Sequence, residues 1–163
     1  MGAGKSTLGA LLAQGLGWTF VDLDEEIVRA EQKSVADIFM LIGEASFREL
    51  ERAALAGSLQ RKNIVLALGG GAIETDANRQ LLGKDRETLL LYLEAPLDEL
   101  IARCEQQQLE KNAPRRPVLE KRSEITERFL RRKPLYESAH QTIHTSGQHP
   151  EEIVAEILAR IGG

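Results

Sequence analysis

The chain has 163 residues, of which 42% are hydrophobic, 28% charged and only 4% aromatic, and its formal net charge at pH 7 is -4. This composition is typical of one domain with a core of ordinary size, and the net negative charge argues against sequence-independent binding to nucleic acid. A single cysteine excludes an internal disulfide. The sequence also has neither an apolar stretch of about 20 residues nor a signal-peptide pattern. Together these features predict a cytoplasmic protein without a membrane partner.

The first residues, MGAGKST, contain the second half of a phosphate-binding loop. The full pattern is G-x-x-x-x-G-K-[ST] after a buried strand; here Gly4, Lys5 and Ser6 supply its end, and a helix is predicted over residues 7–16. Glycines let backbone N–H groups turn toward phosphate oxygens, while a lysine reaches the β- and γ-phosphates and a serine hydroxyl binds Mg²⁺. The alternative is a polar helix start with Ser6 or Thr7 as its N-cap.

The next predicted strand, WTFVDLD, ends in two carboxylates and precedes a helix over residues 24–31. Asp22 and Asp24 point to the same side of an extended strand, at the carboxyl end where open α/β sheets bind ligands. One carboxylate could hold Mg²⁺ through water while the other accepts a hydrogen bond from a substrate hydroxyl. In the alternative reading, Asp24 only caps the helix that follows.

Two helices are predicted next, over residues 34–42 and 44–60. The second helix carries Arg48 and Glu51, and this spacing of three residues allows the carboxylate to hold the guanidinium in one orientation. Because a guanidinium donates two parallel hydrogen bonds to a carboxylate or phosphate, Arg48 is a candidate anion ligand.

Three consecutive glycines, Gly69, Gly70 and Gly71, follow the buried strand NIVLAL. Glycine weakens a strand, and a tight turn rarely needs three of them, so the run favours a backbone that approaches a ligand closely.

The remaining chain continues the alternation of helices and short apolar strands. Helices are predicted over residues 75–82, 96–108, 122–140 and 151–161, and strands at ETLLLYLEA and QTIHT. This alternation predicts a parallel sheet covered on both faces, within a single domain over residues 1–163. The polar segment 106–121, which carries Arg115 and Arg116, is predicted to be a mobile lid over the site.

In their order and spacing, the motifs GAGKST, FVDLDEEI, SVADIF, IGEASFRELE, LALGGGAI, LYLEAP, RRPVL, RRKPLY and HTSGQHPEEI resemble those of shikimate kinase, a family of small P-loop kinases. The resemblance runs essentially end to end. It implies a three-layer α/β/α fold with a parallel sheet of about five strands. It also implies a monomer that uses ATP and Mg²⁺ to phosphorylate the 3-hydroxyl of shikimate, in chorismate and aromatic amino-acid biosynthesis.

The resemblance assigns roles to individual residues. As catalytic residues it implies Asp24, which would help take the hydroxyl proton, and Lys5 and Arg116, which would neutralise charge in the transition state. For shikimate binding it implies Asp24, Arg48, Gly69, Gly70, Gly71, Arg132, Phe39, Phe47 and Glu51. For nucleotide binding it implies Gly2, Ala3, Gly4, Lys5, Ser6, Thr7, Arg103, Arg116 and Pro150, and for Mg²⁺ Ser6 and Asp22.

The family's loop often reads GxMGAGKST, so Met1 corresponds to an internal methionine. We therefore expect about ten further residues ahead of Met1, carrying the first loop glycine and a strand that is central in this fold. Two other functions stay open. One is a related small-metabolite kinase such as gluconate kinase, which VDLD, GGG and the paired arginines disfavour. The other is a nucleotide-binding domain whose catalysis is impaired by the incomplete loop.

Overall fold

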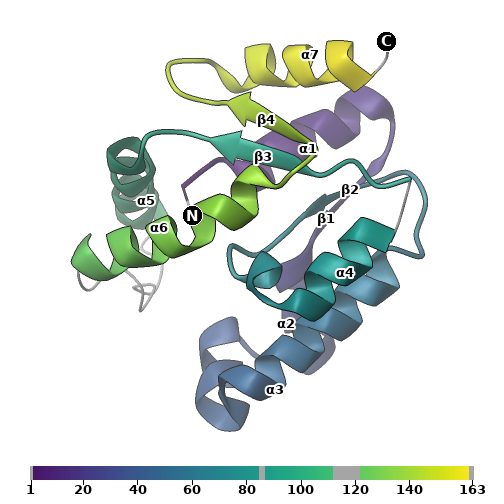
Figure 1. Ribbon diagram of the computed structural model, residues 1–163, viewed down its shortest axis with the longest axis vertical. Coiled ribbons are helices and arrows are strands. Elements are labelled where there is room, and N and C mark those ends of the chain that lie inside the picture. Colours follow the sequence, from purple (N-terminus) through teal and green to yellow (C-terminus); the bar gives the residue numbers. More distant parts are fainter. Residues whose placement is uncertain (1, 85–86, 112–121, 162–163) are drawn as a thin grey trace.

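The computed structural model describes residues 2–84, 87–111 and 122–161 and has helices packed around short parallel strands (Figure 1). In chain order its elements are α1 (Lys5–Leu16), β1 (Thr19–Asp22), α2 (Leu23–Glu31), α3 (Val35–Ser58), β2 (Ile64–Ala67), the 3-10 helix η1 (Ala72–Glu74), α4 (Asp76–Lys84), β3 (Leu91–Glu94), α5 (Leu97–Lys111), α6 (Arg122–Glu137), β4 (Gln141–His144) and α7 (Pro150–Ile161). The predicted alternation of strands and helices is confirmed.

The two helices predicted over residues 34–42 and 44–60 form one long element, α3, with a kink at Gly43. Ser34 caps its start, where the side chain accepts a hydrogen bond from the backbone N–H of Asp37 at 3.1 Å. Gly43 has φ 77° and ψ 171°, a left-handed φ that only glycine adopts at little cost. The break therefore falls at a glycine, where this backbone conformation costs little.

The strands form two separate parallel sheets. β1 pairs with β2, from Thr19 opposite Ile64 to Asp22 opposite Ala67. β3 pairs with β4, from Leu91 opposite Gln141 onward. Parallel pairing was predicted and is confirmed, but within the described residues each strand pairs along one edge only, so the sheet is divided.

A cavity of about 890 Å³ lies between the two sheets. Its wall includes Val65 and Leu66 of β2, Leu91 and Leu93 of β3, and Leu12 of α1, whereas no residue of β1 or β4 contributes to it. The unpaired edges of β2 and β3 therefore both border this apolar space. The strand expected ahead of residue 1 stays a prediction.

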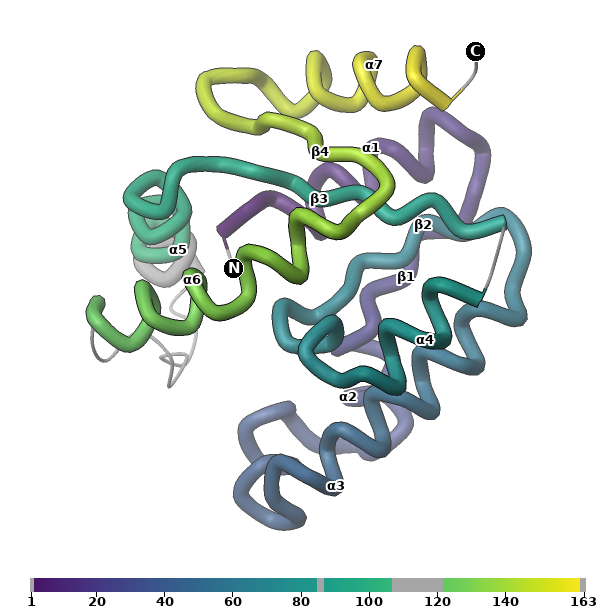
Figure 2. Tube along the Cα trace, in the orientation of Figure 1, coloured from purple at the N-terminus to yellow at the C-terminus, as the bar shows by residue number. Residues whose placement is uncertain are grey.

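Helix α1 joins the two halves of the molecule, one built on the sheet of β1 and β2 and the other on the sheet of β3 and β4. It packs against β1 and β2 on one side and against α7 on the other (Figure 1). Its apolar face contributes to the core cluster Leu8, Leu12, Ile143, Ile153, Val154 and Ile157. The start of the described chain lies beside α5, as the tube trace in Figure 2 shows. Among the helices that the structure describes, none has the length and apolar character needed to cross a membrane.

We expect Ile143→Val to lower the free energy of unfolding by about 0.5–1.5 kcal/mol, because it removes a methyl group from a closed part of the core. Ile143 is 0% exposed, whereas Ile161 is 38% exposed and provides the matched control. Urea unfolding of both variants measures the difference. Equal, small effects of Ile143→Val and Ile161→Val would contradict the packing described for β4.

Candidate active site

The phosphate-binding loop turns on two glycines and leads directly into α1. Gly2 and Gly4 have φ of 65° and 78°, and the Gly4 carbonyl accepts the N–H of Leu8 at 2.8 Å. The helix begins at Lys5, two residues earlier than predicted. Since a helix N-terminus and inward backbone N–H groups both favour anions, this segment can hold phosphate oxygens.

Ser6 and Asp22, the two predicted Mg²⁺ ligands, lie in direct contact. The Ser6 hydroxyl donates to Asp22 Oδ2 at 3.0 Å, and Asp22 Oδ1 accepts the backbone N–H of Asp24 at 3.1 Å. Asp22 is therefore the N-cap of α2, and the reading that Asp24 is the cap is wrong. This leaves the Asp24 carboxylate out of the cap.

The oxygen donors fit the coordination chemistry of Mg²⁺. A hydroxyl and a carboxylate are hard ligands, and Mg²⁺ in kinases keeps several waters and binds one or two side chains plus substrate phosphates. In the part of the chain that the structure describes, no group of three or more histidine, cysteine or acidic side chains could hold a metal by itself. Ser6 and Asp22 would thus hold the ion together with a nucleotide.

Charged side chains press against the backbone of the glycine turn. A Cβ atom at Gly69 would lie 2.7 Å from Asp24 Oδ1, and one at Gly71 would lie 2.7 Å from Arg48 Nη2. The Gly70 carbonyl accepts the hydroxyl of Tyr136 at 2.7 Å. A side chain at position 69 or 71 would therefore force Asp24 or Arg48 to move.

Arg48 is held by a buried carboxylate. Its Nη1 donates to both oxygens of Glu51, at 3.1 and 3.0 Å, and Asn78 Nδ2 lies 3.5 Å from Glu51 Oε2 and 2.8 Å from the carbonyl of Ala72. Glu51 is 1% exposed. Burial raises the pKa of Glu51, against the opposing charge and hydrogen bonds of Arg48. The predicted pairing of Arg48 with Glu51 is present in the structure, together with an anchor, Asn78, that the sequence did not indicate.

Arg132 reaches the same turn from α6 and meets Glu74. Its Nη2 donates to Glu74 Oε2 at 2.7 Å, and Arg131 Nη2 donates to Glu74 Oε1 at 3.0 Å. Arg48 Nη2 lies 3.8 Å from Glu74 Oε2. The structure thus brings Arg48 and Arg132 together around one carboxylate. The sequence did not identify Glu74 as a site residue. The only available signal was its position, three residues after the glycine run.

The two phenylalanines predicted to line the substrate differ in exposure. Their rings lie 4.4 Å apart between centroids, tilted by 31°. Phe47 is buried with Ile27 and Ile38, and the Arg48 guanidinium carbon lies 5.7 Å from the centroid of its ring. Phe39 is only partly buried, so it is the ring with surface left for a ligand.

On the predicted nucleotide side, Arg103 is held by two neighbouring residues. It donates to the carbonyl of Thr145 at 2.8 Å and forms an ion pair with Glu99. Pro150 is the first residue of α7. Arg116 and residues 112–121 of the predicted lid lie outside the described residues, and residues 106–111 are the last of α5.

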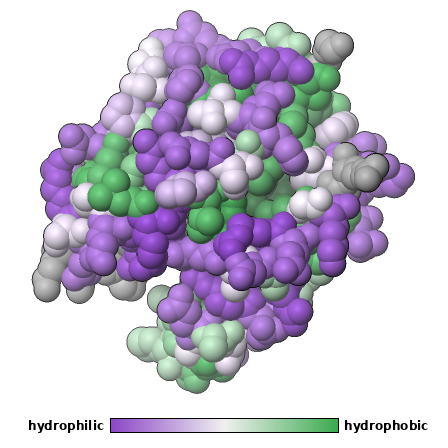
Figure 3. All heavy atoms as spheres, viewed as in Figure 1, coloured by the Kyte–Doolittle hydropathy of each residue, from purple (hydrophilic) through white to green (hydrophobic). Residues whose placement is uncertain are grey.

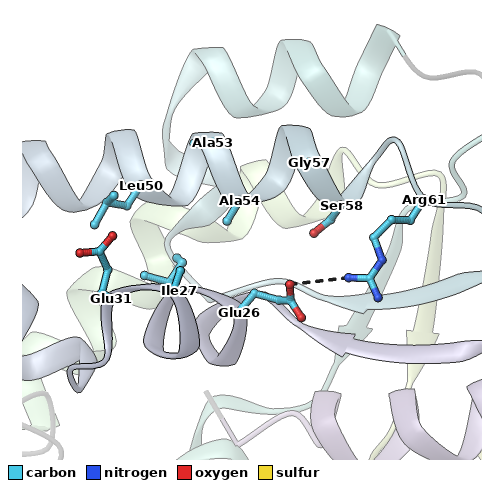
Figure 4. A pocket seen from close by; sticks show the side chains of 10 residues that line it. Glu26, Ile27, Glu31, Leu50, Ala53, Ala54, Gly57, Ser58 and Arg61 are labelled. Atoms are coloured by element: carbon cyan, nitrogen blue, oxygen red, sulfur yellow. Dashed lines mark ion pairs between the residues drawn. The ribbon is translucent and has the colours of Figure 1, made fainter.

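A smaller cavity, of about 310 Å³, lies between α2 and α3 (Figure 4). Small residues of α3 form one wall, and Glu26 and Arg61 pair at its rim at 3.6 Å between Oε2 and Nη1. It contains none of the predicted site residues, so it is separate from the candidate active site.

The sequence model of one family, described as shikimate kinase, matches residues 1–162. The chain belongs to the shikimate kinase family. A shikimate kinase of Persephonella marina is 43% identical over 162 residues, covering 99% of this chain and 94% of that protein. A shikimate kinase of Streptomyces avermitilis is 40% identical over 161 residues, covering 97% and 89%.

Solved structures of shikimate kinases share the fold. The Acinetobacter baumannii enzyme, solved in complex with shikimate, has a TM-score of 0.86 and 35% identity, covering 99% of this chain and 88% of that one. The Bacteroides thetaiotaomicron enzyme has a TM-score of 0.85 and 29% identity, covering 100% and 94%. The predicted fold and enzyme class are confirmed, and neither gluconate kinase nor a nucleotide-binding domain with impaired catalysis is favoured.

We expect the stabilisation provided by Glu74 to depend on pH. Burial alone would raise the pKa of Glu74, but the hydrogen bonds and charges of Arg132 and Arg131 hold it below the ordinary 4.5. The ionised form therefore stabilises the fold above the unfolded pKa, and this stabilisation is lost as the pH falls through the lower folded pKa.

The measurement is the difference in unfolding free energy between the unmodified chain and Glu74→Gln, by urea unfolding at about pH 7 and about pH 3. The difference is expected to shrink at the lower pH. A difference that stays constant or grows would contradict the ion-pair network described for Glu74.

Proposed function

We propose that this protein transfers the γ-phosphoryl group of ATP to the 3-hydroxyl of shikimate, giving 3-phosphoshikimate and ADP. Membership of the family supports the reaction, and the observation that carries it to residues is the convergence of Asp24, Arg48 and Arg132 on the glycine turn. The same proposal includes a monomer that works in the cytoplasm, in chorismate and aromatic amino-acid biosynthesis.

Substrate binding would depend on the two arginines. The guanidinium groups of Arg48 and Arg132 donate paired hydrogen bonds to the carboxylate of shikimate, and a carboxylate bound at two points leaves the ring little freedom to rotate. The backbone of the glycine turn then contacts the ring hydroxyls, with Gly70 nearest to both Arg132 and Tyr136. Glu51 supports the clamp by holding Arg48.

Asp24 would act on the accepting hydroxyl. Its carboxylate lies against Gly69, next to the arginine clamp and one residue into α2. A carboxylate there accepts the hydroxyl hydrogen bond, orients the oxygen toward the γ-phosphorus and takes the proton as the new P–O bond forms. Asp22 is held differently: its oxygens accept hydrogen bonds from the Ser6 hydroxyl and from the backbone N–H of Asp24.

The phosphates would lie at the loop before α1. Backbone N–H groups of residues 2–7 donate to the phosphate oxygens, and Lys5 and Arg116 neutralise the charge that develops in transfer. Ser6 and Asp22 would hold Mg²⁺, which supplies further neutralisation of the β- and γ-phosphate oxygens when bound. Arg103 and Pro150 would flank the adenine, with Arg103 stacked on the base.

The test is coupled ADP release with ATP, Mg²⁺ and shikimate as the acceptor. Shikimate-dependent ADP release, with 3-phosphoshikimate as the product, supports the proposal. Turnover with gluconate instead would favour the related small-metabolite kinase, and nucleotide binding without turnover of either acceptor would favour a non-catalytic domain.

We expect Asp24→Asn to lower kcat by about 10²–10⁴-fold while the KM for shikimate changes little, because the amide cannot take the proton. Asp76→Asn is the matched control, since Asp76 has an 81% exposed side chain and pairs with Arg79 on the surface of α4. Steady-state kinetics of both variants decide the matter. A kcat for Asp24→Asn within twofold of the unmodified chain would remove Asp24 from the mechanism.

We expect Arg48→Lys to raise the KM for shikimate by about tenfold or more and to leave the KM for ATP unchanged, because an ammonium cannot donate in the planar, paired geometry. Arg52→Lys, one turn along α3 and paired with Glu49 on the surface, is the control. Equal effects on the two substrates would instead indicate a general loss of structure.

A further inference from the structure

Glu74 has no role in the reaction as described above, although three guanidinium groups surround it. Arg132 and Arg131 donate to its two oxygens at 2.7 and 3.0 Å, and Arg48 Nη2 lies 3.8 Å from Oε2. Its side chain is only 23% exposed. The arginines of α3 and α6 thus form an anion site that already contains the carboxylate of Glu74 from η1.

The backbone that carries Glu74 is fixed. The N–H of Glu74 donates to the carbonyl of Gly71 at 3.0 Å, and Arg79 Nη1 donates to the carbonyls of Ile73 and Glu74 at 2.7 and 2.8 Å. Asn78 holds the carbonyl of Ala72. Rotation of the Glu74 side chain can therefore clear the space between Arg48 and Arg132 without any change in the backbone of η1.

A ligand carboxylate would draw on the same two arginines. Both Nη atoms of Arg48 already contact protein carboxylates, Nη1 with Glu51 and Nη2 with Glu44, and Nη2 of Arg132 is taken by Glu74. Arg132 Nε is buried and has no hydrogen-bond partner among the described residues. Two carboxylates in this space also repel each other, since like charges this close disfavour joint ionisation.

We propose that Glu74 is an internal competitor for the substrate: its carboxylate occupies the anion site of Arg48 and Arg132 in the free protein, and the substrate carboxylate displaces it. This inference rests on the proposed function. Glu74 is thus a residue that sets affinity and positions the two arginines, and it is not a catalytic residue.

The competitor weakens binding of the product as well as of the substrate. The product keeps the carboxylate of the substrate, so Glu74 competes with it for Arg48 and Arg132 in the same way. As the product leaves, Glu74 returns to Arg48 and Arg132, and its ion pairs replace those that the product carboxylate made. The expected effect of Glu74 is a higher KM together with faster product release.

The first experiment is calorimetric titration of shikimate, without nucleotide, into the unmodified chain, Glu74→Gln and Glu74→Ala. Both variants are expected to bind about three- to tenfold more tightly, because the competing charge is gone, while Glu74→Gln is less stable to urea. A structural role alone predicts weaker binding together with lower stability. The opposite signs of the two effects therefore identify the competitor.

The matched control is Glu44→Gln. Glu44 also contacts Arg48, at 3.1 Å, but its side chain is 69% exposed and it makes no contact with Arg132 among those described. Its removal is expected to change the Kd by less than twofold. A shikimate analogue with an amide in place of the carboxylate provides a second control, because its affinity is expected not to improve in Glu74→Gln.

Steady-state kinetics complete the test. In Glu74→Gln we expect the KM for shikimate to fall and kcat to fall or stay the same, because product release slows. An unchanged or higher Kd in both Glu74 variants, with binding by the unmodified chain intact, would overturn the inference alone. Failure of the unmodified chain to bind shikimate at all would overturn the proposed function and this inference with it.

Discussion

The ion pair between Arg48 and the buried carboxylate of Glu51 is the interaction around which the site is arranged. A carboxylate that is 1% exposed costs several kcal/mol unless a partner compensates it, so Glu51 and Arg48 fix each other on α3. The Arg48 guanidinium then lies so close to the glycine turn after β2 that a side chain at position 71 would force it to move. Gly71 leads directly into the short helix η1, so this contact lies next to the element that carries Glu74.

The sequence predicted those parts of the site whose partners are near in the chain or carried by a motif. Three features could be predicted because each depends on local geometry: the spacing of Arg48 and Glu51, the half loop at Lys5, and the glycine run. The roles of Glu74 and Asn78 could not be predicted, because their partners are distant in the chain. Glu74 lies 57 and 58 residues from Arg131 and Arg132. Asn78 lies 27 residues from Glu51. Such contacts depend on how α3, α4 and α6 pack, which no local pattern encodes.

The fold shows the same division between local and distant causes. Apolar periods and glycines located the strands and α-helices of the described residues to within a few residues, but the short helix η1 was not predicted. The join of two helices into α3 depended on whether the kink at Gly43 was sharp enough to end a helix. The separation of the strands into two pairs had no local signal, since each strand is apolar and parallel as expected. An exposed apolar cluster near that kink, Met40, Leu41 and Ile42, at the end of the molecule where α3 begins (Figure 3), was likewise not predicted.

The divided sheet has a consequence for how the protein behaves when it is stressed. Strand edges with unpaired backbone groups are templates for pairing between molecules. In the part of the chain that the structure describes, β2 and β3 each keep such an edge beside an apolar space. While α1 holds the halves together, the two edges face one another across the cavity. An opening at α1 would uncover both of these edges together, so the packing of α1 protects backbone groups that lie far from it in the chain.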